Sequence, residues 1–256
     1  MLGPLARSSP LRRAGGVGLV VVLTLLTQVL GIVLWPALGL ANAPTPRPVA
    51  KAGGLAMALV VLSWPLVAGL ASLGGRVPLP CLTEPTLAPH TLGFCLAHRH
   101  YVRPDVRDTL LSVSREVAAA HPGTTVRFLD AGFPFAGLPL LPHLSHHDGR
   151  KVDLALFGER GGSPIGYFGY VAPDRDPACP PHWLDLRWDF AWLQPALRLH
   201  LDEARTATLV RALTRHPGVR KLLLEPHLAR RLGVRSDKIR FQGCRAARHD
   251  DHVHVQ

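Results

Sequence analysis

Two long stretches of the chain are apolar, and neither alternates hydrophobic with polar positions. Residues 14–46 carry no charge and contain the run 17–40, and residues 52–75 have their apolar centre at 55–73. Runs of this length can cross about 30 Å of hydrocarbon as helices. Neither run has the polar face that a surface helix of a soluble protein shows to water. The pattern predicts two transmembrane helices, at about 17–40 and 55–73, in a membrane anchor formed by residues 1–75.

An alternative for the first run is a cleaved signal peptide. Ala41-Asn42-Ala43 follows the run as small residues follow the apolar region of a signal peptide. The run is long for such a region, so a retained helix is the preferred interpretation. Two spans would place the N-terminus and residues 76–256 on one side of the membrane. Three arginines lie within the first thirteen residues, and two basic residues, Arg47 and Lys51, lie in the loop between the spans. Because basic residues are retained on the cytoplasmic side, the larger number at the N-terminus favours a cytoplasmic N-terminus and, with two spans, a cytoplasmic domain.

Residues 76–256 change to short helical and strand patterns. Val106, Leu110, Val113 and Val117 recur at helical spacing and predict a helix over 104–120, and a second helix is expected over 202–214. Each is followed by a His-Pro-Gly triplet, which we interpret as a helix breaker. Strands are expected at 124–129, 152–157, 219–225 and 251–256. This alternation predicts a domain that mixes α and β structure.

Composition separates the two parts of the chain further. The 256 residues include 29 Lys+Arg, 18 Asp+Glu and 14 His, a net charge of +11, yet residues 1–74 hold no Asp, Glu, His or Cys. No basic stripe is interleaved with aromatic residues, so a nucleic-acid partner is not expected. The four cysteines are an even set without CxxC spacing. Disulfides and small reduced core cysteines both remain open, and spacing does not choose a pairing.

Histidine-rich segments carry the candidate chemistry. One runs from His143 to Asp153 and includes His146, and the other is His249-Asp250-Asp251-His252-Val253-His254. Zinc favours imidazole nitrogen and carboxylate oxygen, and a catalytic site keeps three protein ligands and a water. His146 lies in a turn with Gly149, and Asp153 begins the following strand. Residues two apart in a strand point to the same side, so His252 and His254 face one cavity, where only one of them need bind the metal.

The same residues resemble a known family. His146 and Asp153 match the H-x(6)-D signature of the lysostaphin/D-Ala-D-Ala-metallopeptidase/hedgehog-like superfamily, and His252-Val253-His254 resembles its closing H-x-H. The nearest branch is the penicillin-insensitive murein endopeptidases, in which a histidine precedes each motif by three residues, as His143 and His249 do. Leu193-Gln194-Pro195 and residues 219–228 are less specific points of resemblance. The similarity covers roughly residues 120–256.

The resemblance implies Zn²⁺ bound by His146, Asp153 and His254, with His252 as the catalytic histidine and His143 and His249 in supporting roles. It implies a compact α+β zinc-peptidase domain over residues 76–256, built around a mainly antiparallel sheet. The expected activity is hydrolysis of peptide cross-links in peptidoglycan, with the domain on the outer face of the cytoplasmic membrane and stem peptides as substrates. A D,D-carboxypeptidase and a non-catalytic zinc-stabilised wall-binding module are the alternatives.

The sequence defines the roles of several other polar residues less closely. Related D,D-carboxypeptidases use the glutamate of an E-x-x-H motif as a base; no such motif precedes His252, and Glu225 is expected to be structural. Asp250 and Asp251 either orient His249 or a metal-binding imidazole, or remain solvated. Arg150 and Lys151 belong to a solvated turn or select an acidic peptide. His98 and His100 are not expected to bind metal, because no carboxylate accompanies them.

Overall fold

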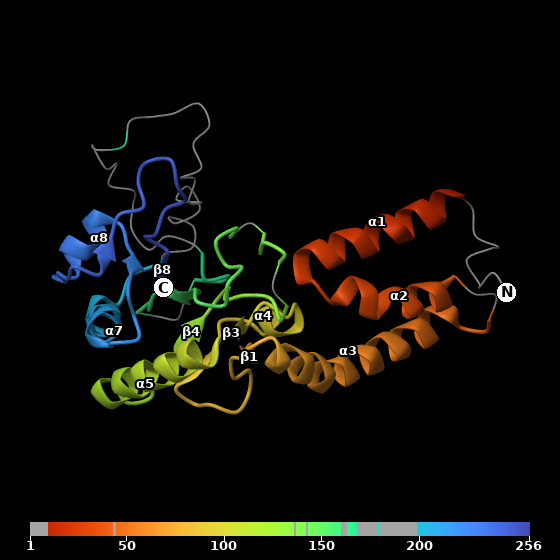
Figure 1. The fold of residues 1–256 in the computed structure, drawn as a ribbon, viewed down its shortest axis with the longest axis horizontal. Helices are drawn as coiled ribbons and strands as arrows, with labels where there is room; N and C mark the ends of the chain where they lie inside the picture. Colours follow the sequence, from red (N-terminus) through yellow and green to blue (C-terminus); the bar gives the residue numbers. More distant parts are fainter. Residues whose placement is uncertain are drawn as a thin grey trace.

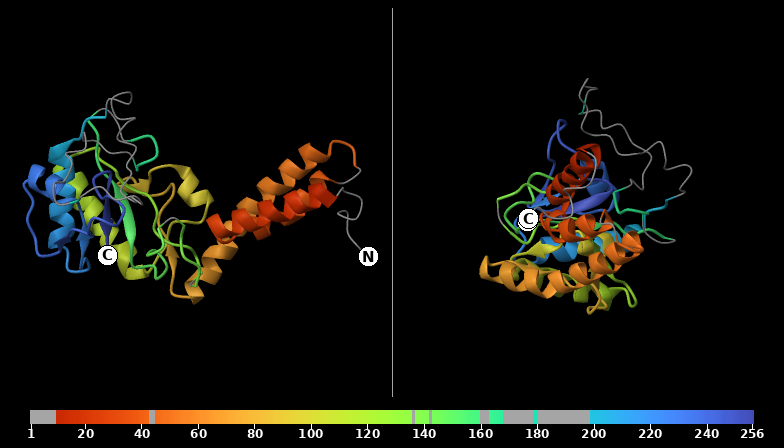
Figure 2. Two further views of the ribbon diagram at one scale, coloured as in Figure 1. Left: turned by 90° about the horizontal axis from the view of Figure 1, so that it is seen from above. Right: turned by 90° about the vertical axis from the view of Figure 1, so that its right-hand side faces the viewer.

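The computed structural model describes residues 10–42, 45–135, 137–141, 143–159, 163–167, 179 and 199–256. Three helices form an arm that projects from an α+β domain, as Figures 1 and 2 show. The arm consists of α1 (Pro10–Thr27), α2 (Leu30–Ala41) and α3 (Pro48–Leu73). The less specific motif Leu193-Gln194-Pro195 lies outside the described residues.

The elements of the domain alternate along the chain, in keeping with the mixed pattern of the sequence. In chain order they are β1 (Val77–Pro78), β2 (Leu87–Pro89), α4 (Leu92–Leu96), β3 (Tyr101–Val102), α5 (Pro104–Ala120), β4 (Val126–Phe128), β5 (Val152–Ala155), α7 (Glu203–Arg215), β6 (Leu222–Leu223), α8 (Pro226–Arg231), β7 (Ile239–Arg240) and β8 (His252–Val255). The four strands and two helices expected in the domain are therefore present, the strands with shorter bounds than predicted.

The main sheet is mixed, with strand order β2-β4-β5-β8-β6-β7. Its centre is antiparallel, because β5 pairs antiparallel with both β4 and β8, and β8 does so with β6. Both edges are parallel, β2 against β4 and β6 against β7. The expectation of a mainly antiparallel sheet thus holds for the centre and is wrong for the edges, where helices connect the paired strands in sequence.

The core lies on one face of this sheet. Val152 and Leu154 on β5 and Val253 and Val255 on β8 share one hydrophobic cluster with residues of α5 and α7. Leu110, Val113 and Val117 of the predicted stripe are buried in α5, and Val106 is partly buried. Because side chains alternate along a strand, the intervening positions of β5 and β8 are turned to the other face. That face carries the polar residues described below.

Of the described helices, only α3 is long and apolar enough to cross a membrane, with 26 residues and an 18-residue stretch of mean hydropathy 2.0. At 1.5 Å per residue it is about 39 Å long. It includes the second predicted span, 55–73. The first predicted span, a single helix at 17–40, is wrong: the chain breaks at Gln28 and folds back, so that α1 and α2 are two shorter apolar helices.

The break has a local cause and a distant one. Gln28 adopts a left-handed backbone conformation, with φ of 65°. The Thr27 hydroxyl accepts a hydrogen bond from the backbone N–H of Leu30 at 3.0 Å, which satisfies the first N–H of α2. The side-chain amide of Gln28 pairs with the backbone of Phe135 in the domain. A side chain at Gly31 would meet the carbonyl oxygen of Val20, so this glycine lets α2 fold back against α1.

The turn between α1 and α2 lies at the domain, and the arm extends away from it (Figure 1). Both α1 and α3 run towards the domain, so their first residues lie at the far end of the arm. Arg12 and Arg13 are in the first turn of α1, and Arg47 and Lys51 are at the start of α3. The N-terminal side of α1 and the domain therefore lie at opposite ends of the arm, contrary to the expectation from two spans.

All four cysteines are in disulfides, Cys81–Cys95 and Cys179–Cys244. Of the two states left open by the sequence, the oxidised one is the one observed. Structural disulfides are typical of secreted and extracytoplasmic domains. Together with α3, they indicate a protein of the membrane or of the space outside the cytoplasm.

Candidate metal centre

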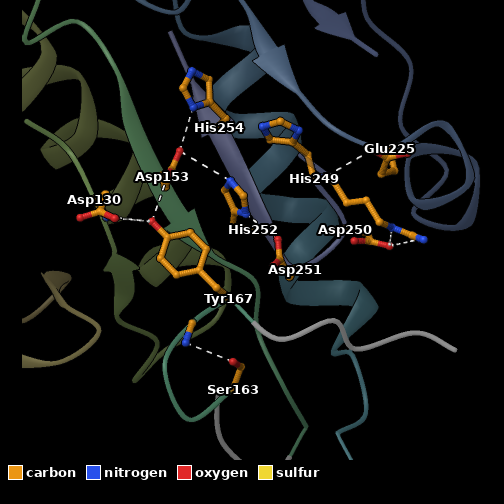
Figure 3. A network of polar contacts seen from close by, with 12 residues as sticks. Asp130, Asp153, Ser163, Tyr167, Glu225, His249, Asp250, Asp251, His252 and His254 are labelled. Carbon is orange, nitrogen blue, oxygen red and sulfur yellow. Dashed lines mark hydrogen bonds and ion pairs between the residues drawn. The ribbon is translucent and has the colours of Figure 1, made fainter. Parts of the chain in front are cut away.

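The register of the two central strands brings three candidate residues together. Asp153 lies directly opposite His254, and Ala155 lies opposite His252. Directly paired residues of neighbouring strands share a face, and so do residues two apart in one strand. Asp153, His252 and His254 therefore point into one space on the face opposite the core (Figure 3). All three side chains are buried.

The turn before β5 supplies His146. Its ring Nδ1 donates a hydrogen bond to the carbonyl oxygen of Ala131 at 2.8 Å. In the neutral ring this contact leaves the lone pair on Nε2, which faces Asp153 and His254. Such a contact from the second ring nitrogen fixes the tautomer and orientation of most metal-binding histidines.

The turn itself is held by Arg76, which directly follows the arm. This buried guanidinium donates to the carbonyl oxygens of Phe133, at 3.0 Å, and of His147. Gly149 has a φ of 71° and lies against the guanidinium, within 3.3 Å of the position that a Cβ would take. A side chain there would be strained and would press on Arg76, which explains the glycine in this motif.

Three donor atoms converge at the centre of this space. The distances are 2.8 Å from Asp153 Oδ1 to His254 Nδ1, 3.3 Å from Asp153 Oδ1 to His146 Nε2, and 3.1 Å from His146 Nε2 to His254 Nδ1. Ligands ~2.0–2.2 Å from a tetrahedral zinc ion are ~3.3–3.6 Å from one another. The triangle is slightly tighter than that, so small outward movements of the side chains would accommodate an ion.

His143 is a further candidate ligand. Its Nδ1 lies 3.1 Å from Asp153 Oδ2, the carboxylate oxygen that does not contact His146 or His254. The donor atoms of His143, His146 and Asp153 lie within 4.8 Å of one another, as a shared metal ion requires. His143 is half-buried, whereas His254 is fully enclosed. The residues expected as ligands are thus adjacent, and the structure adds a fourth donor at the rim.

His252 lies beside the triangle. Its Nε2 is 3.7 Å from Asp153 Oδ1 and, within the described part of the chain, has no hydrogen-bond partner although it is buried. Its Nδ1 is hydrogen-bonded to the carboxylate of Asp251. Asp251 thus orients an imidazole, but that of His252 and not of His249 or an expected metal ligand, and its solvated alternative is wrong. Asp250 is buried too and binds Arg248 (Figure 3).

His249 is packed behind the two strand histidines. Its ring centroid is 4.9 Å from that of His252 and 5.8 Å from that of His254. Its backbone N–H donates to Glu225 Oε1 at 3.3 Å, and its carbonyl oxygen accepts from the N–H of Glu225 at 3.0 Å. These contacts give His249 a supporting position and give Glu225 the structural role expected of it.

Two residues of this site were not identified from the sequence. The Tyr167 hydroxyl contacts Asp153 Oδ2 at 3.0 Å and Asp130 Oδ2 at 3.1 Å (Figure 3). Asp130 in turn forms an ion pair with Arg99. Asp130 comes two residues after the strand β4, and this position could have identified it from the sequence as a site residue. Tyr167 lies in a glycine-rich segment without periodicity, so nothing local indicated it.

The electrostatics of the space favour a cation. Burial tends to raise the pKa of Asp153, but the surrounding imidazoles of His146, His252 and His143 outweigh it and hold this pKa well below its ordinary value. Burial tends to lower the pKa of His252, but Asp153 and Asp251 raise it to about 9. Burial and the neighbouring His252 lower the pKa of His249 to about 2. Three buried carboxylates, those of Asp130, Asp153 and Asp251, lie among these imidazoles, and a divalent metal ion would take the place of the protons that the imidazoles bind without it.

The remaining candidates lie elsewhere. Lys151 forms an ion pair with Asp148 at 2.8 Å, and Arg150 is exposed. His98 and His100 are both buried. His100 lies close to Cys81 and Cys95, but the disulfide removes both sulfurs as thiolate ligands.

Comparisons with known proteins add no relative to this description. No protein-family model matches the chain, and no curated protein matches it.

Proposed function

We propose that this chain is a membrane-anchored zinc peptidase that hydrolyses the peptide cross-links of peptidoglycan. One observation carries the proposal: two imidazole nitrogens and one carboxylate oxygen, from His146, His254 and Asp153, converge within 3.3 Å of one another. This ligand set belongs to catalytic zinc sites, which keep a fourth position for water. The peptidoglycan substrate rests on the motif resemblance of residues 120–256.

The roles of the chain's own residues follow from their contacts. Zinc, when bound, would polarise the scissile carbonyl and lower the pKa of a coordinated water to about 7. The Nδ1 of His252 is held by Asp251, and Nε2 faces the site. The positive charge of a bound zinc ion would lower the pKa of this ring and leave a lone pair on Nε2. That atom can accept a proton and return it to the leaving amine, or stabilise negative charge on the carbonyl oxygen.

An enzyme is favoured over a wall-binding module by the arrangement around His252. A module that only needs zinc for stability has no use for a buried imidazole nitrogen that lies beside the ligands without a hydrogen-bond partner in the described structure. Burying such an atom costs free energy. In an enzyme, the bound substrate would supply the hydrogen-bond partner that Nε2 of His252 lacks, so this cost would be offset in the complex.

The arm supports a position of the domain outside the cytoplasm. Arg12, Arg13, Arg47 and Lys51 lie at the end of the arm that is farthest from the domain. Basic residues near spans are retained on the cytoplasmic side. A single crossing by α3 then places the domain across the membrane, where the two disulfides are stable. A reporter that is active only in the periplasm, fused after Gln256, should be active, and activity of a cytoplasm-only reporter there would contradict this topology.

The activity is tested with the full chain in detergent. Isolated sacculi are incubated with the protein, with a chelator, and with the chelator followed by zinc, and released muropeptides are identified by mass spectrometry. Conversion of cross-linked dimers to monomers, abolished by chelation and restored by zinc, is the expected result. Loss of terminal D-alanine with dimers intact would identify a D,D-carboxypeptidase. Zinc binding without any change in the muropeptides would favour the binding module.

A further inference from the structure

One side chain, that of Arg99, connects the arm with the surroundings of the metal centre. Arg99 lies just before β3, and its side chain is only 12% exposed. Its Nε donates to Asp130 Oδ1 at 2.5 Å, one terminal nitrogen donates to the carbonyl oxygen of Leu26 at 3.0 Å, and the other donates to that of Leu141 at 2.7 Å. Segments that are far apart in the sequence therefore meet at this guanidinium.

The contact with Asp130 leads to the ligand carboxylate. The Tyr167 hydroxyl lies between the carboxylates of Asp130 and Asp153 (Figure 3). The backbone carbonyl of Asp130 also accepts a hydrogen bond from the N–H of Asp153 at 2.8 Å. Asp130 is buried, and a buried carboxylate that loses its ion-pair partner is strongly unfavourable. Removal of Arg99 would therefore rearrange the groups that hold Asp153.

The backbone of Arg99 leads to a second candidate ligand. Its carbonyl oxygen accepts a hydrogen bond from the N–H of Ala131 at 2.9 Å, and the carbonyl oxygen of Ala131 accepts from His146 Nδ1. The guanidinium contact with Leu141 lies two residues before His143. Arg99 is thus connected to His146 through one backbone contact and to His143 through the loop that carries it.

The α1–α2 hairpin meets the domain at the same place. Leu26 is in the last turn of α1, where the carbonyl groups have no partner within the helix and a positive charge is favourable. Gln28, two residues later, pairs with the backbone of Phe135. The hairpin therefore contacts both the guanidinium and the loop that leads to His143 and His146. Its docking restrains the groups that hold the candidate ligands.

We infer that Arg99 is a positioning residue of the metal centre, and that docking of the α1–α2 hairpin on Arg99 and Phe135 raises the metal affinity of the centre. The guanidinium holds Asp130, and through it Asp153, in the arrangement that a metal ion requires. The hairpin fixes the guanidinium in turn. The inference rests on the proposed metal centre and not on the reaction there, and it gives the arm a regulatory role in addition to anchoring.

Zinc affinity of the full chain in detergent, measured by competition with a chromogenic chelator, tests the positioning role. Arg99→Leu should lower the affinity about tenfold, at the lower end of the range for residues that hold a ligand in place. Arg115→Leu is the matched control and should keep wild-type affinity. Arg115 also faces a carboxylate, that of Glu84 at 3.8 Å, but it is exposed on α5, on the other side of the sheet. An unchanged affinity in Arg99→Leu would overturn the positioning role.

Arg99→Lys keeps the protein charge and gives a second measurement. It retains a cation beside Asp130, but one ammonium group does not reproduce the fork of the guanidinium. Its zinc affinity should lie between those of the wild type and Arg99→Leu. In the metal-free variant, hydrogen exchange should accelerate at the amides of Ala131 and His146 and stay unchanged at that of Val117 in α5. Equal acceleration at all three amides would show a general loss of stability and overturn the inference.

Combination with Gln28→Leu tests the part of the hairpin. This change removes the neighbouring contact of the hairpin and should lower zinc affinity by a smaller factor than Arg99→Leu. If both residues act through docking, the double variant should lose no more affinity than Arg99→Leu alone. Two factors that multiply would show independent effects, and an unchanged affinity in Gln28→Leu would show that the hairpin has none. Either result would overturn the regulatory role.

The same proteins are incubated with sacculi, which separates this inference from the proposed activity. An affinity that depends on Arg99, together with unchanged muropeptides, would support the inference and contradict the peptidase. Cleavage of cross-links with an affinity that is independent of Arg99 would do the reverse. A wild-type chain that binds no zinc would overturn both.

Discussion

The side-chain amide of Gln28 exchanges two hydrogen bonds with the backbone of Phe135. Its Nε2 donates to the carbonyl oxygen at 3.0 Å, and its Oε1 accepts from the N–H at 2.9 Å. The pair joins the turn of the α1–α2 hairpin to the loop that leads to His143 and His146. The anchor is thus part of the scaffold that holds the candidate metal ligands, and it is more than a tether.

Replacement of Gln28 by Leu should destabilise this junction. Both backbone groups of Phe135 would lose their partner, at a cost of about 1–3 kcal/mol. Hydrogen exchange at the Phe135 amide should accelerate, and the melting temperature should fall. Asn42→Leu is the matched control, since Asn42 also bonds a backbone carbonyl, but on the exposed end of the arm. Equal exchange in both variants would show that the pair does not hold the loop.

Neighbouring histidines offer a sharp test of metal binding. His146→Ala should lower zinc affinity at least about a hundredfold, because it removes a donor atom and not only an outer contact. His147→Ala should keep wild-type affinity, since that side chain is exposed and points elsewhere. Zinc content after dialysis and competition with a chromogenic chelator measure the effect. A wild-type zinc content in the His146 variant would remove this residue from the ligand set.

His252→Ala separates catalysis from metal binding. Nε2 of this residue lies outside the triangle of donor atoms, so zinc should remain bound. Loss of a proton-transfer group should lower the hydrolysis rate by about 10²–10⁴. Asp251→Asn should lower the rate by a smaller factor, because it disturbs only the orientation of the ring. Intact hydrolysis in the His252 variant would contradict the proposed mechanism.

Tyr167→Phe tests the contact beneath the ligand carboxylate. The change removes one hydrogen bond to Asp153 and one to Asp130 without altering the volume of the ring. Zinc affinity should fall about 10–100-fold, the range for partners of metal ligands. The control is Tyr101→Phe, the same change at a buried tyrosine outside the metal centre. An unchanged affinity would show that Tyr167 only fills space.

Two buried histidines near the arm predict a loss of stability in mild acid. Burial lowers the pKa of His98 to about 4 and that of His100 to about 3. In the unfolded chain both titrate near ~6.5, so between these values the unfolded state binds more protons. The contribution of these two histidines to the free energy of unfolding should therefore be constant above about pH 6.5 and should fall as the pH drops from there towards 4.

The slope should reach at most about 1.4 kcal/mol per pH unit for each histidine. Thermal unfolding between pH 7 and 5, followed by near-ultraviolet circular dichroism, measures it. His98→Asn and His100→Asn together should make the slope shallower and leave the part that His249 contributes, and asparagine tolerates the left-handed backbone of position 98, where φ is 53°. His147→Asn should leave the slope unchanged. A double variant as acid-sensitive as the wild type would assign the effect to other groups.

The sequence by itself determined the features that depend on local spacing. The positions of Leu110, Val113 and Val117 fix the buried face of α5 because a helix repeats every 3.6 residues. His252 and His254 share a face because a strand repeats every two. The short distance from His146 to Asp153 keeps these residues together through one turn. The proximity of the two histidine clusters was inferred from their chemistry, and the register of β5 with β8 provides it.

Only the tertiary structure decided the features that depend on distant partners. The proline of the run 17–40, Pro36, lies inside α2 and not at the break. The break at Gln28 depends on its contact with Phe135 in the domain as well as on local contacts. That contact reverses α2 and separates the basic residues of the arm from the domain. Tyr167 and Arg76 likewise gain their roles from residues far along the chain. Hydrophobic periodicity records which side of an element is buried, but not which distant group it meets, because that choice is made by packing of the whole fold.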